Sequence, residues 1–276
     1  MKVKYISDLH LGRSYSNLLT HNYISEHPED DADVLVVAGD LSSISKLKNY
    51  KPDNDEDYVL VEFINWCDKN FKRTIIVPGN HEFYDGTDLK EFLDGYCFNL
   101  TSKVVVASNT IVSVPDPSSD CDVHFVCSTM WSNVTESNIP YVNACMNDTR
   151  LIRWHGSKFL ANRFQYAHTV CKDNIVKTLA TLDRIGVPSC KVVVVTHHCP
   201  SLLCENPMHE GGPLSSAFIA DDMHDTIETF SPAYWVYGHT HYNKDIDLFD
   251  THIVSNQMGY HEGESSAFSF DKFFCI

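Results

Sequence analysis

The sequence of 276 residues lacks any apolar run that approaches the roughly 20 residues needed to cross a bilayer. Its opening residues 1–6 include two lysines but neither a long apolar stretch nor a small-residue cleavage site, the features of a secretory leader. These residues are instead typical of a first strand. The absences predict a cytoplasmic protein that has no membrane partner.

Positive charge is also scarce in this chain. There are 21 lysine and arginine residues against 37 aspartate and glutamate residues, which gives a formal net charge of −16. Because sequence-independent binding to nucleic acid depends on basic side chains that neutralise phosphates, a nucleic-acid partner is not expected. A small phosphorylated molecule remains compatible with this charge, since bound divalent cations reverse the field around them.

Paired cysteine motifs and internal repeats are missing as well. The ten cysteines include no pair with CxxC spacing and are spread over the chain. Cys127 lies in a strand-like run and Cys171 in a helix-like one, where a thiol behaves as a small buried apolar side chain. We therefore expect reduced thiols rather than disulfides.

Short apolar runs, by contrast, recur along the whole sequence. Four of them are nearly continuous Val, Ile and Leu, which indicates strands buried on both faces. Helical periodicity is expected at residues 57–70 and 157–185. A middle block, residues 104–130, is predicted to form consecutive strands. The mixture predicts sheets packed between helices rather than one parallel sheet. The predicted strands are residues 3–6, 34–38, 74–77, 104–107, 111–114, 123–127, 191–196, 233–237 and 251–255.

Five short segments rich in Asp, His and Asn are the most informative feature, and most of them follow an apolar run. Because side chains at i and i+2 of an extended segment point to the same side, the side chains of the first segment can reach one cation. The last segment repeats this spacing. Since the segments span both ends of the chain, we expect residues 1–276 to form a single domain. Their candidate ligands are Asp8, His10, Asp40, Asn80, His197, His239 and His241.

Taken singly, each of these segments is more often a turn or a hydrogen-bonded surface residue than a ligand. Five together make a metal site the better interpretation. A structural metal would normally have a closed, cysteine-rich site, and this set contains no cysteine. Gly39 lets the backbone approach closely, so that the Asp40 carboxylate can bridge two ions. Mixed imidazole and carboxylate ligands favour Mn, Fe, Zn, Ni or Co over Ca.

The ordered motifs, Asp-x-His, Gly-Asp, Gly-Asn-His-Glu, His and Gly-His-x-His, resemble those of the calcineurin-like metallophosphoesterase superfamily, including poorly characterised bacterial and phage-type members. The resemblance implies an α/β fold in which two packed mixed sheets are flanked by helices in a four-layer α/β/β/α sandwich. It also implies two divalent metal ions and places His81 beside the leaving group. It assigns Asp8, His10, Asp40 and His241 to the first ion, and Asp40, Asn80, His197 and His239 to the second.

The expected chemistry is hydrolysis of a phosphodiester or phosphomonoester. Two ions about 3.5–4 Å apart can share a hydroxide that attacks phosphorus in line with the departing oxygen. A protonated His81 can donate to that oxygen. Either Glu82 or Asp148 can orient its imidazole, and Asp148 is also a candidate substrate contact. His198 follows the candidate ligand His197. It is not expected to bind metal itself but to lie behind the ligands, where it could contact substrate.

Residues 39–45 lack the arginine that Ser/Thr protein phosphatases carry in the corresponding motif. Residues 7–12 are similar to those of DNA-end nucleases, but the acidic composition argues against such a substrate. A protein phosphatase, a nuclease and a non-catalytic scaffold of the same fold therefore remain alternatives to a hydrolase for a nucleotide or another small substrate. The sequence does not indicate the oligomeric state.

Two segments between the motifs, residues 131–153 and 200–213, are expected to select the substrate. Residues 146–153 are predicted to place Arg150 and Arg153 on one helical turn, where they can reach a phosphate oxygen; pairing with surface acids is the favoured alternative. Residues 200–213 form either a lid over the site or an inert connection.

Overall fold

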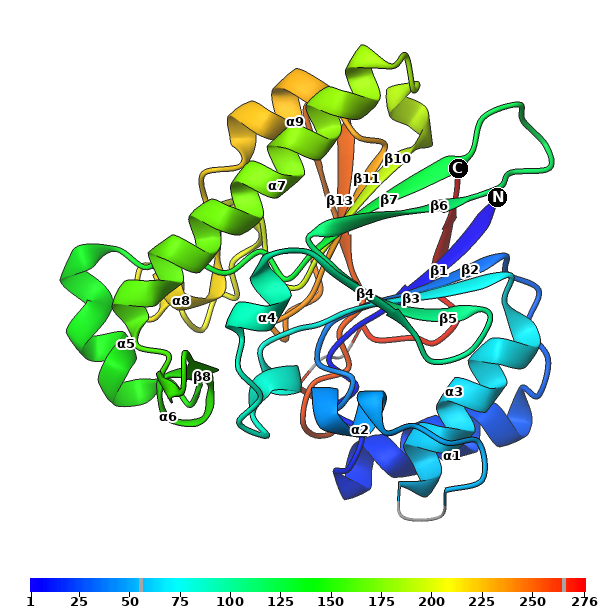
Figure 1. Ribbon diagram of the computed structural model, residues 1–276, viewed down its shortest axis with the longest axis horizontal. Coiled ribbons are helices and arrows are strands. Elements are labelled where there is room, and N and C mark those ends of the chain that lie inside the picture. The colour runs from blue at the N-terminus through cyan, green and yellow to red at the C-terminus, as the bar shows by residue number, and fades with distance from the viewer. Residues whose placement is uncertain (55–56, 265–266) are drawn as a thin grey trace.

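Two six-stranded sheets face each other at the centre of the computed structural model, which describes residues 1–54, 57–264 and 267–276 (Figure 1). The first sheet has the order β14 (Phe273–Cys275), β1 (Lys2–Ile6), β2 (Val34–Ala38), β3 (Arg73–Val77), β5 (Val104–Ser108) and β4 (Tyr96–Asn99). The second has the order β12 (Ile246–Leu248), β13 (Thr251–Ser255), β11 (Tyr234–Tyr237), β10 (Val192–Thr196), β7 (Val123–Ser128) and β6 (Thr110–Val114). The four inner strands of each sheet are parallel and the outer two are antiparallel.

The inner strands are buried on both faces. In β2, Val36 and Ala38 belong to the apolar layer between the sheets, whereas Leu35 and Val37 face the helices. Successive side chains of a strand point to opposite faces, so a strand covered on both sides must be apolar throughout. This explains the continuous Val, Ile and Leu runs in the sequence.

Helices cover the outer face of each sheet. Helices α1 (Ser14–Glu26) and α3 (Tyr58–Asn70) lie over the first sheet, and α7 (Phe164–Arg184) and α9 (His224–Phe230) lie over the second (Figure 1). The predicted four-layer α/β/β/α sandwich is confirmed. The other helices are α2 (Ile44–Lys48), α4 (Lys90–Leu93), α5 (Ile139–Cys145), α6 (Asp148–Leu151) and α8 (Ser215–Phe218). Among the described residues, no helix has both the length and the apolar character of a membrane span.

The predicted helix at residues 157–185 begins too early. A small hairpin of β8 (Arg153–Trp154) and β9 (Ser157–Lys158) occupies its first turn, and α7 begins only at Phe164. Phe159 is fully buried, with its ring stacked 4.7 Å from that of Phe164. Its apolar side chain therefore serves the core from a loop and does not continue the helix. The edge strands β4, β12 and β14 were not predicted, because short, partly exposed strands lack a continuous apolar run.

The middle block forms consecutive strands as predicted, but they divide between the sheets. Strand β5 belongs to the first sheet, and β6 and β7 belong to the second. The chain crosses at Asn109, which has a left-handed φ of 48°. Its side chain donates to the carbonyl of Leu93 at 3.0 Å and accepts from the Ser128 hydroxyl at 2.6 Å.

Candidate metal centre

Loops that follow five inner strands meet at one end of the two sheets. They follow β1, β2 and β3 in the first sheet and β10 and β11 in the second. Because these strands are parallel within each sheet, their carboxyl ends lie at one edge, the usual position of sites in such sheets. The seven candidate ligands lie on these loops, as expected from the sequence.

Asp8, His10 and His241 form one group, in which the candidate ligand atoms lie within 4.8 Å of one another. Nε2 of His241 is 3.3 Å from Oδ1 of Asp8 and 3.2 Å from Nε2 of His10. Residues more than 230 positions apart thus direct three ligand-type atoms to one point.

Asp40, His197 and His239 form a second group of the same dimensions. Nε2 of His197 lies 3.3 Å from Oδ1 of Asp40 and 3.0 Å from Oδ1 of Asn80. The other Asp40 oxygen, Oδ2, lies 3.8 Å from Nε2 of His10 in the first group. The two oxygens of Asp40 therefore face different groups.

The residues present fit a pair of cations. Asp8 and Asp40 are buried carboxylates, and charges are rarely buried unless they are paired or coordinate a metal. Nε2 of His239 is buried and has no hydrogen-bond partner among the described residues. Buried polar atoms are normally satisfied, so an orphan nitrogen aimed at this cluster is the expected arrangement for a metal ligand.

Backbone strain is concentrated at the ligands. Positive φ angles between 45° and 70° occur at Asp8, His10, Asp40, His239 and His241. A left-handed conformation costs a non-glycine residue about 1–2 kcal/mol. The expectation that Asp8 and His10 share a side of extended backbone is therefore wrong. Two tight left-handed residues bring the side chains together instead.

Two glycines make room for the second group. A Cβ atom at Gly79 would lie 2.2 Å from Oδ1 of Asp40 and 2.7 Å from Nε2 of His197. A Cβ atom at Gly39 would lie 2.1 Å from Nδ1 of His197. Only glycine allows the backbone to approach these side chains so closely.

Glu82 joins the ligand loops and does not orient His81. Its carboxylate accepts backbone N–H groups from Gly79 at 2.6 Å, Asp40 at 3.0 Å and Leu41 at 2.7 Å. Burial, together with the charge of Asp40, raises the pKa of this carboxyl to about 8. The side chain thus ties the loop after β2 to the loop after β3.

Hydrogen bonds hold two histidine rings with Nε2 directed inward. Nδ1 of His197 lies 2.8 Å from the carbonyl oxygen of Ala38, and Nδ1 of His241 lies 2.7 Å from Oε1 of Glu264. Burial disfavours charge on His241, but Asp8 and Glu264 outweigh it and raise its pKa to about 10. Such partners fix the ring orientation that a metal ligand requires.

His81 lies at the rim of the cluster. Its backbone N–H donates to Oδ1 of Asp40 at 2.9 Å, and its Nε2 lies 3.8 Å from Oδ2 of the same carboxylate. The hydroxyl of Tyr260 is 2.8 Å from this Nε2. The ring of Tyr84 packs against the imidazole at 4.1 Å. Aromatic contacts, rather than Glu82 or Asp148, position the His81 ring.

A cavity of about 700 Å³ opens over the centre. Its wall includes Asp148, whose Oδ2 accepts the Tyr84 hydroxyl at 3.2 Å, and burial raises the pKa of this carboxyl. None of the described residues that line it is Lys or Arg. Segments 131–153 and 200–213 both contribute. The side chains they supply are Cys145, Met146, Asn147, Asp148, Asn206, Met208 and His209.

Arg150 and His198 are absent from the described lining of this cavity. The guanidinium of Arg150, on α6, donates to the carbonyl of Ala144 in α5. Helix α6 ends at Leu151 and Arg153 begins β8, so the predicted pair of arginines on one helical turn is wrong. His198 is buried, and its ring packs 4.2 Å from that of His239.

Three residues at this end of the fold were not singled out from the sequence. Tyr260 and Glu264 follow β13 and contact His81 and His241, and Arg13 lies three residues after His10. The rule that ligands follow strands would have drawn attention to the segment after β13. Its motif, Gln257–Met258–Gly259–Tyr260, contains no Asp or His.

The chain has recognisable relatives. A protein of Acanthamoeba polyphaga mimivirus, described as uncharacterized, is 26% identical over 275 residues, covering 94% of this chain and 91% of that protein. The crystal structure of phosphopantetheinyl hydrolase from Mycobacterium tuberculosis has a TM-score of 0.62 and 16% identity, with 94% and 89% of the two chains covered. A dimetal phosphatase from Danio rerio has a TM-score of 0.49 and 15% identity, with 94% and 88% covered.

At 16% identity, the likeness to the solved hydrolase structure shows a shared fold and nothing more. Family membership comes from the sequence: the family model described as calcineurin-like phosphoesterase matches residues 1–243. This match spans all seven candidate ligands, and the two ligand groups agree with the two divalent ions that the family uses. The chain therefore belongs to the calcineurin-like phosphoesterase family.

Proposed function

We propose that this protein hydrolyses phosphodiester or phosphomonoester bonds of a small substrate such as a nucleotide. The observation that carries the proposal is the position of Asp40, whose two oxygens face two ligand groups at the floor of an open cavity. A site that only stabilised the fold would be closed, whereas a catalytic one keeps access to substrate.

Two sets of residues would hold the metal ions, with Asp40 common to both. When bound, the ions supply Lewis-acid stabilisation of the phosphoryl oxygens and activate water. The ligands are mixed nitrogen and oxygen donors, which Mn, Fe, Zn, Ni and Co all accept. The first set is Asp8, His10, Asp40 and His241, and the second is Asp40, Asn80, His197 and His239.

His81 would donate a proton from Nε2 to the departing oxygen. This atom lies at the rim of the centre and faces the same cavity as the ligands. Tyr260, 2.8 Å away, would hold the imidazole in place until substrate enters. A positioned acid of this kind typically contributes about 10²–10⁴-fold to the rate.

The cavity would hold the alcohol part of the substrate. Its walls carry the aromatic rings of Tyr84, Phe218 and Tyr242 together with the carboxyl of Asp148. A second phosphate would find no lysine or arginine among the described lining residues. This supports a substrate with a single phosphoryl group.

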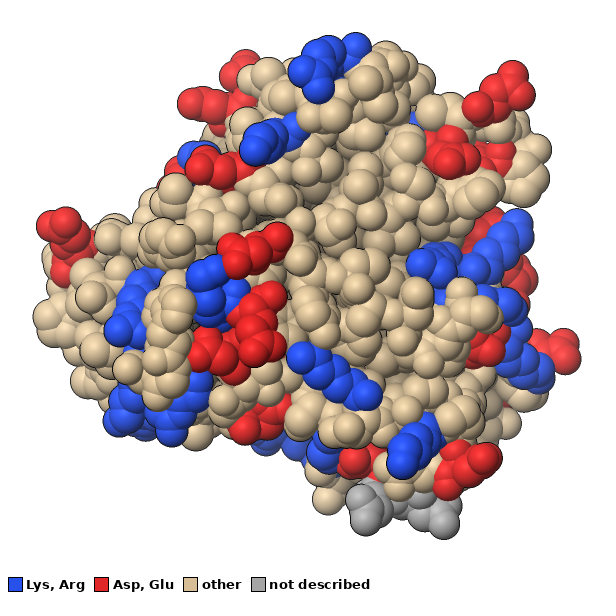
Figure 2. All heavy atoms as spheres, viewed as in Figure 1, with Lys and Arg blue, Asp and Glu red and all other residues tan. Residues whose placement is uncertain are grey.

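A nuclease and a non-catalytic scaffold are both less well supported than a hydrolase for a small substrate. On the face shown in Figure 2, the Lys and Arg side chains of the described residues lie among Asp and Glu, and the whole chain has a net charge of −16. A nuclease would need a continuous basic surface for the phosphate backbone. A non-catalytic scaffold would not require His81 at the rim of an intact ligand set.

The test is hydrolysis of bis-p-nitrophenyl phosphate and p-nitrophenyl phosphate by protein loaded with Mn²⁺. We expect turnover of at least one ester, and the ratio of the two kcat/KM values gives the diesterase or monoesterase preference. Metal content is measured on the same sample. Failure to hydrolyse either ester with two ions bound per chain would contradict the proposal.

A further inference from the structure

Arg13 is the one lysine or arginine among the described residues that line the two hollows at the metal centre. The described lining of the large cavity contains no such residue, whereas that of a smaller hollow of about 140 Å³ contains Arg13. Both hollows include Asp40 and His81 in their walls. A phosphoryl group at the centre would therefore have one guanidinium beside it.

No described residue neutralises the Arg13 guanidinium. Among the described residues, no carboxylate forms an ion pair with it within 4.0 Å. Its Cζ lies 4.2 Å from the centroid of the Tyr260 ring, a cation–π contact. Because the Tyr260 hydroxyl also contacts Nε2 of His81, the same ring holds both side chains at the centre.

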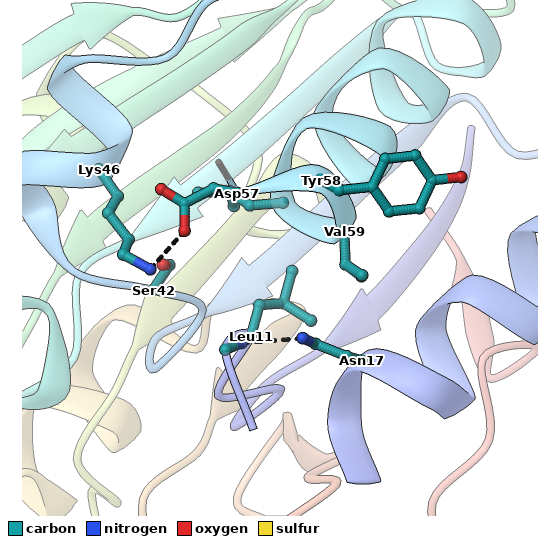
Figure 3. Close-up of a pocket in the computed structure, with 9 residues that line it drawn as sticks. Leu11, Asn17, Ser42, Lys46, Asp57, Tyr58 and Val59 are labelled. Carbon is teal, nitrogen blue, oxygen red and sulfur yellow. Dashed lines mark hydrogen bonds and ion pairs between the residues drawn. The ribbon is translucent and has the colours of Figure 1, made fainter. Parts of the chain in front are cut away.

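The backbone of Arg13 is fixed directly to a candidate ligand. Its N–H donates to the carbonyl of His10 at 3.2 Å, which closes a tight turn. Within that turn, Gly12 has a φ of 116°, and its N–H donates to Oδ1 of Asn17 at 2.8 Å. This anchor is drawn in Figure 3. The backbone at Arg13 is therefore already ordered before the side chain binds an anion.

Other nearby cations are already engaged. Lys46 lines the adjoining hollow of about 340 Å³, and its ammonium is paired with Asp57 (Figure 3). Arg150, the sequence-based candidate for this role, donates to the carbonyl of Ala144 away from the cavity. Only Arg13 combines an unpaired charge with a place at the centre among the described residues of these hollows.

We propose that Arg13 binds a non-bridging oxygen of the phosphoryl group at the metal centre. The planar guanidinium presents a fork of N–H donors that matches a phosphate edge, and such charge-assisted bonds are roughly twice as strong as neutral ones. This inference rests on the proposed function, since both place a phosphate at the same ions. It supplies the arginine that residues 39–45 lack.

Binding of inorganic phosphate to the Mn²⁺-loaded protein, measured by isothermal titration calorimetry, tests the assignment without turnover. Arg13→Ala and Arg13→Gln should each raise Kd about tenfold or more, and Arg13→Lys should recover part of the affinity. Lys46→Ala, the matched control, should leave Kd within about twofold of wild type. Each variant is compared at equal metal content.

Salt dependence separates a phosphate contact from a merely structural role. The wild-type Kd should rise more steeply with NaCl than that of Arg13→Gln, because one charge pair is lost in the variant. An unchanged Kd in Arg13→Ala with both ions retained would overturn the inference, as would wild-type protein that binds metal but no phosphate. If phosphate affinity depends on Arg13 while no ester is hydrolysed, the proposed function fails and this inference stands.

Discussion

Oε1 of Glu264 lies 2.7 Å from Nδ1 of His241, and the opposite ring nitrogen of that histidine lies 3.3 Å from Oδ1 of Asp8. The glutamate follows β13, outside every motif that singled out the ligands. Its other oxygen, Oε2, accepts the backbone N–H of Tyr260 at 2.5 Å. One carboxylate thus orients a candidate ligand and fixes the loop that carries the partner of His81.

Replacing Glu264 with glutamine should weaken metal binding at the first site. A neutral amide accepts a weaker hydrogen bond from Nδ1 and no longer raises the basicity of His241, and such partners typically contribute about 10–100-fold to metal affinity. Chelator competition should show one ion lost earlier than in wild type and the other unchanged. The control is Glu62→Gln, because Glu62 also contacts a histidine, His21, but at the surface. Equal loss in the control would contradict this prediction.

Asp40→Asn should remove both ions, because its two oxygens face both ligand groups. Metal content after dialysis should fall from two ions per chain toward zero. Asp148→Asn is the matched control, since Asp148 is a buried carboxyl on the same cavity that belongs to neither group. It should retain both ions. A stable second ion in Asp40→Asn would show that the carboxylate is not shared.

The sequence was most informative where a residue has to be both polar and placed after a buried strand. Asp8, Asp40 and His197 stand out because each follows a run of apolar residues, just beyond the carboxyl end of a buried strand. The continuous apolar runs predicted sheets packed between helices for the same reason, since burial on both faces requires strands that are apolar throughout. The four-layer sandwich itself was implied by the family resemblance.

Contacts made by ordinary loop residues were not visible in the same way. Tyr260 and Arg13 acquire their positions from left-handed turns and from a cation–π contact, neither of which leaves a periodic pattern. The start of α7 was missed because Phe159, although apolar at a helical spacing, is buried from a loop. Tertiary packing overrides local periodicity in such segments.

His81→Ala should lower kcat about 10²–10⁴-fold with both metal ions retained. The loss should be greater for an alkyl phosphate ester than for a p-nitrophenyl ester, because only the poorer leaving group needs a proton. Rates for the two esters and metal content are measured on the same preparation. His252→Ala, which removes an exposed histidine on β13, is the control. Full activity of His81→Ala toward the alkyl ester would contradict the assigned role.

The absence of lysine and arginine from the described lining of the large cavity predicts a charge preference in the substrate. A nucleoside monophosphate should have a higher kcat/KM than the corresponding triphosphate, since added phosphates meet Asp148 and Glu262 without a counterion. The comparison is made at saturating Mn²⁺ so that chelation by the triphosphate does not strip the centre. Equal kcat/KM values for the two would contradict this prediction.

Asp222, which belongs to neither ligand group, should make folding stability depend on pH. Its Oδ1 lies 2.9 Å from Nε2 of His168 and its Oδ2 lies 2.7 Å from Nζ of Lys172, both on α7. Burial opposes ionisation, but these two partners outweigh it and lower the pKa of the carboxyl to about 2. Because this value is below the unfolded value of 3.8, the ionised carboxylate stabilises the fold above about pH 4.

That contribution should disappear as the pH falls from about 4 to about 2. The side chain is 36% exposed, so solvent screening leaves about 1 kcal/mol rather than the full value that the pKa difference implies. Urea unfolding of metal-free protein should show Asp222→Asn less stable than wild type by this amount at pH 5. The difference should shrink toward pH 3. Asp225→Asn, on the exposed side of α9, should show no such trend, and a difference that grows on acidification would refute the assignment.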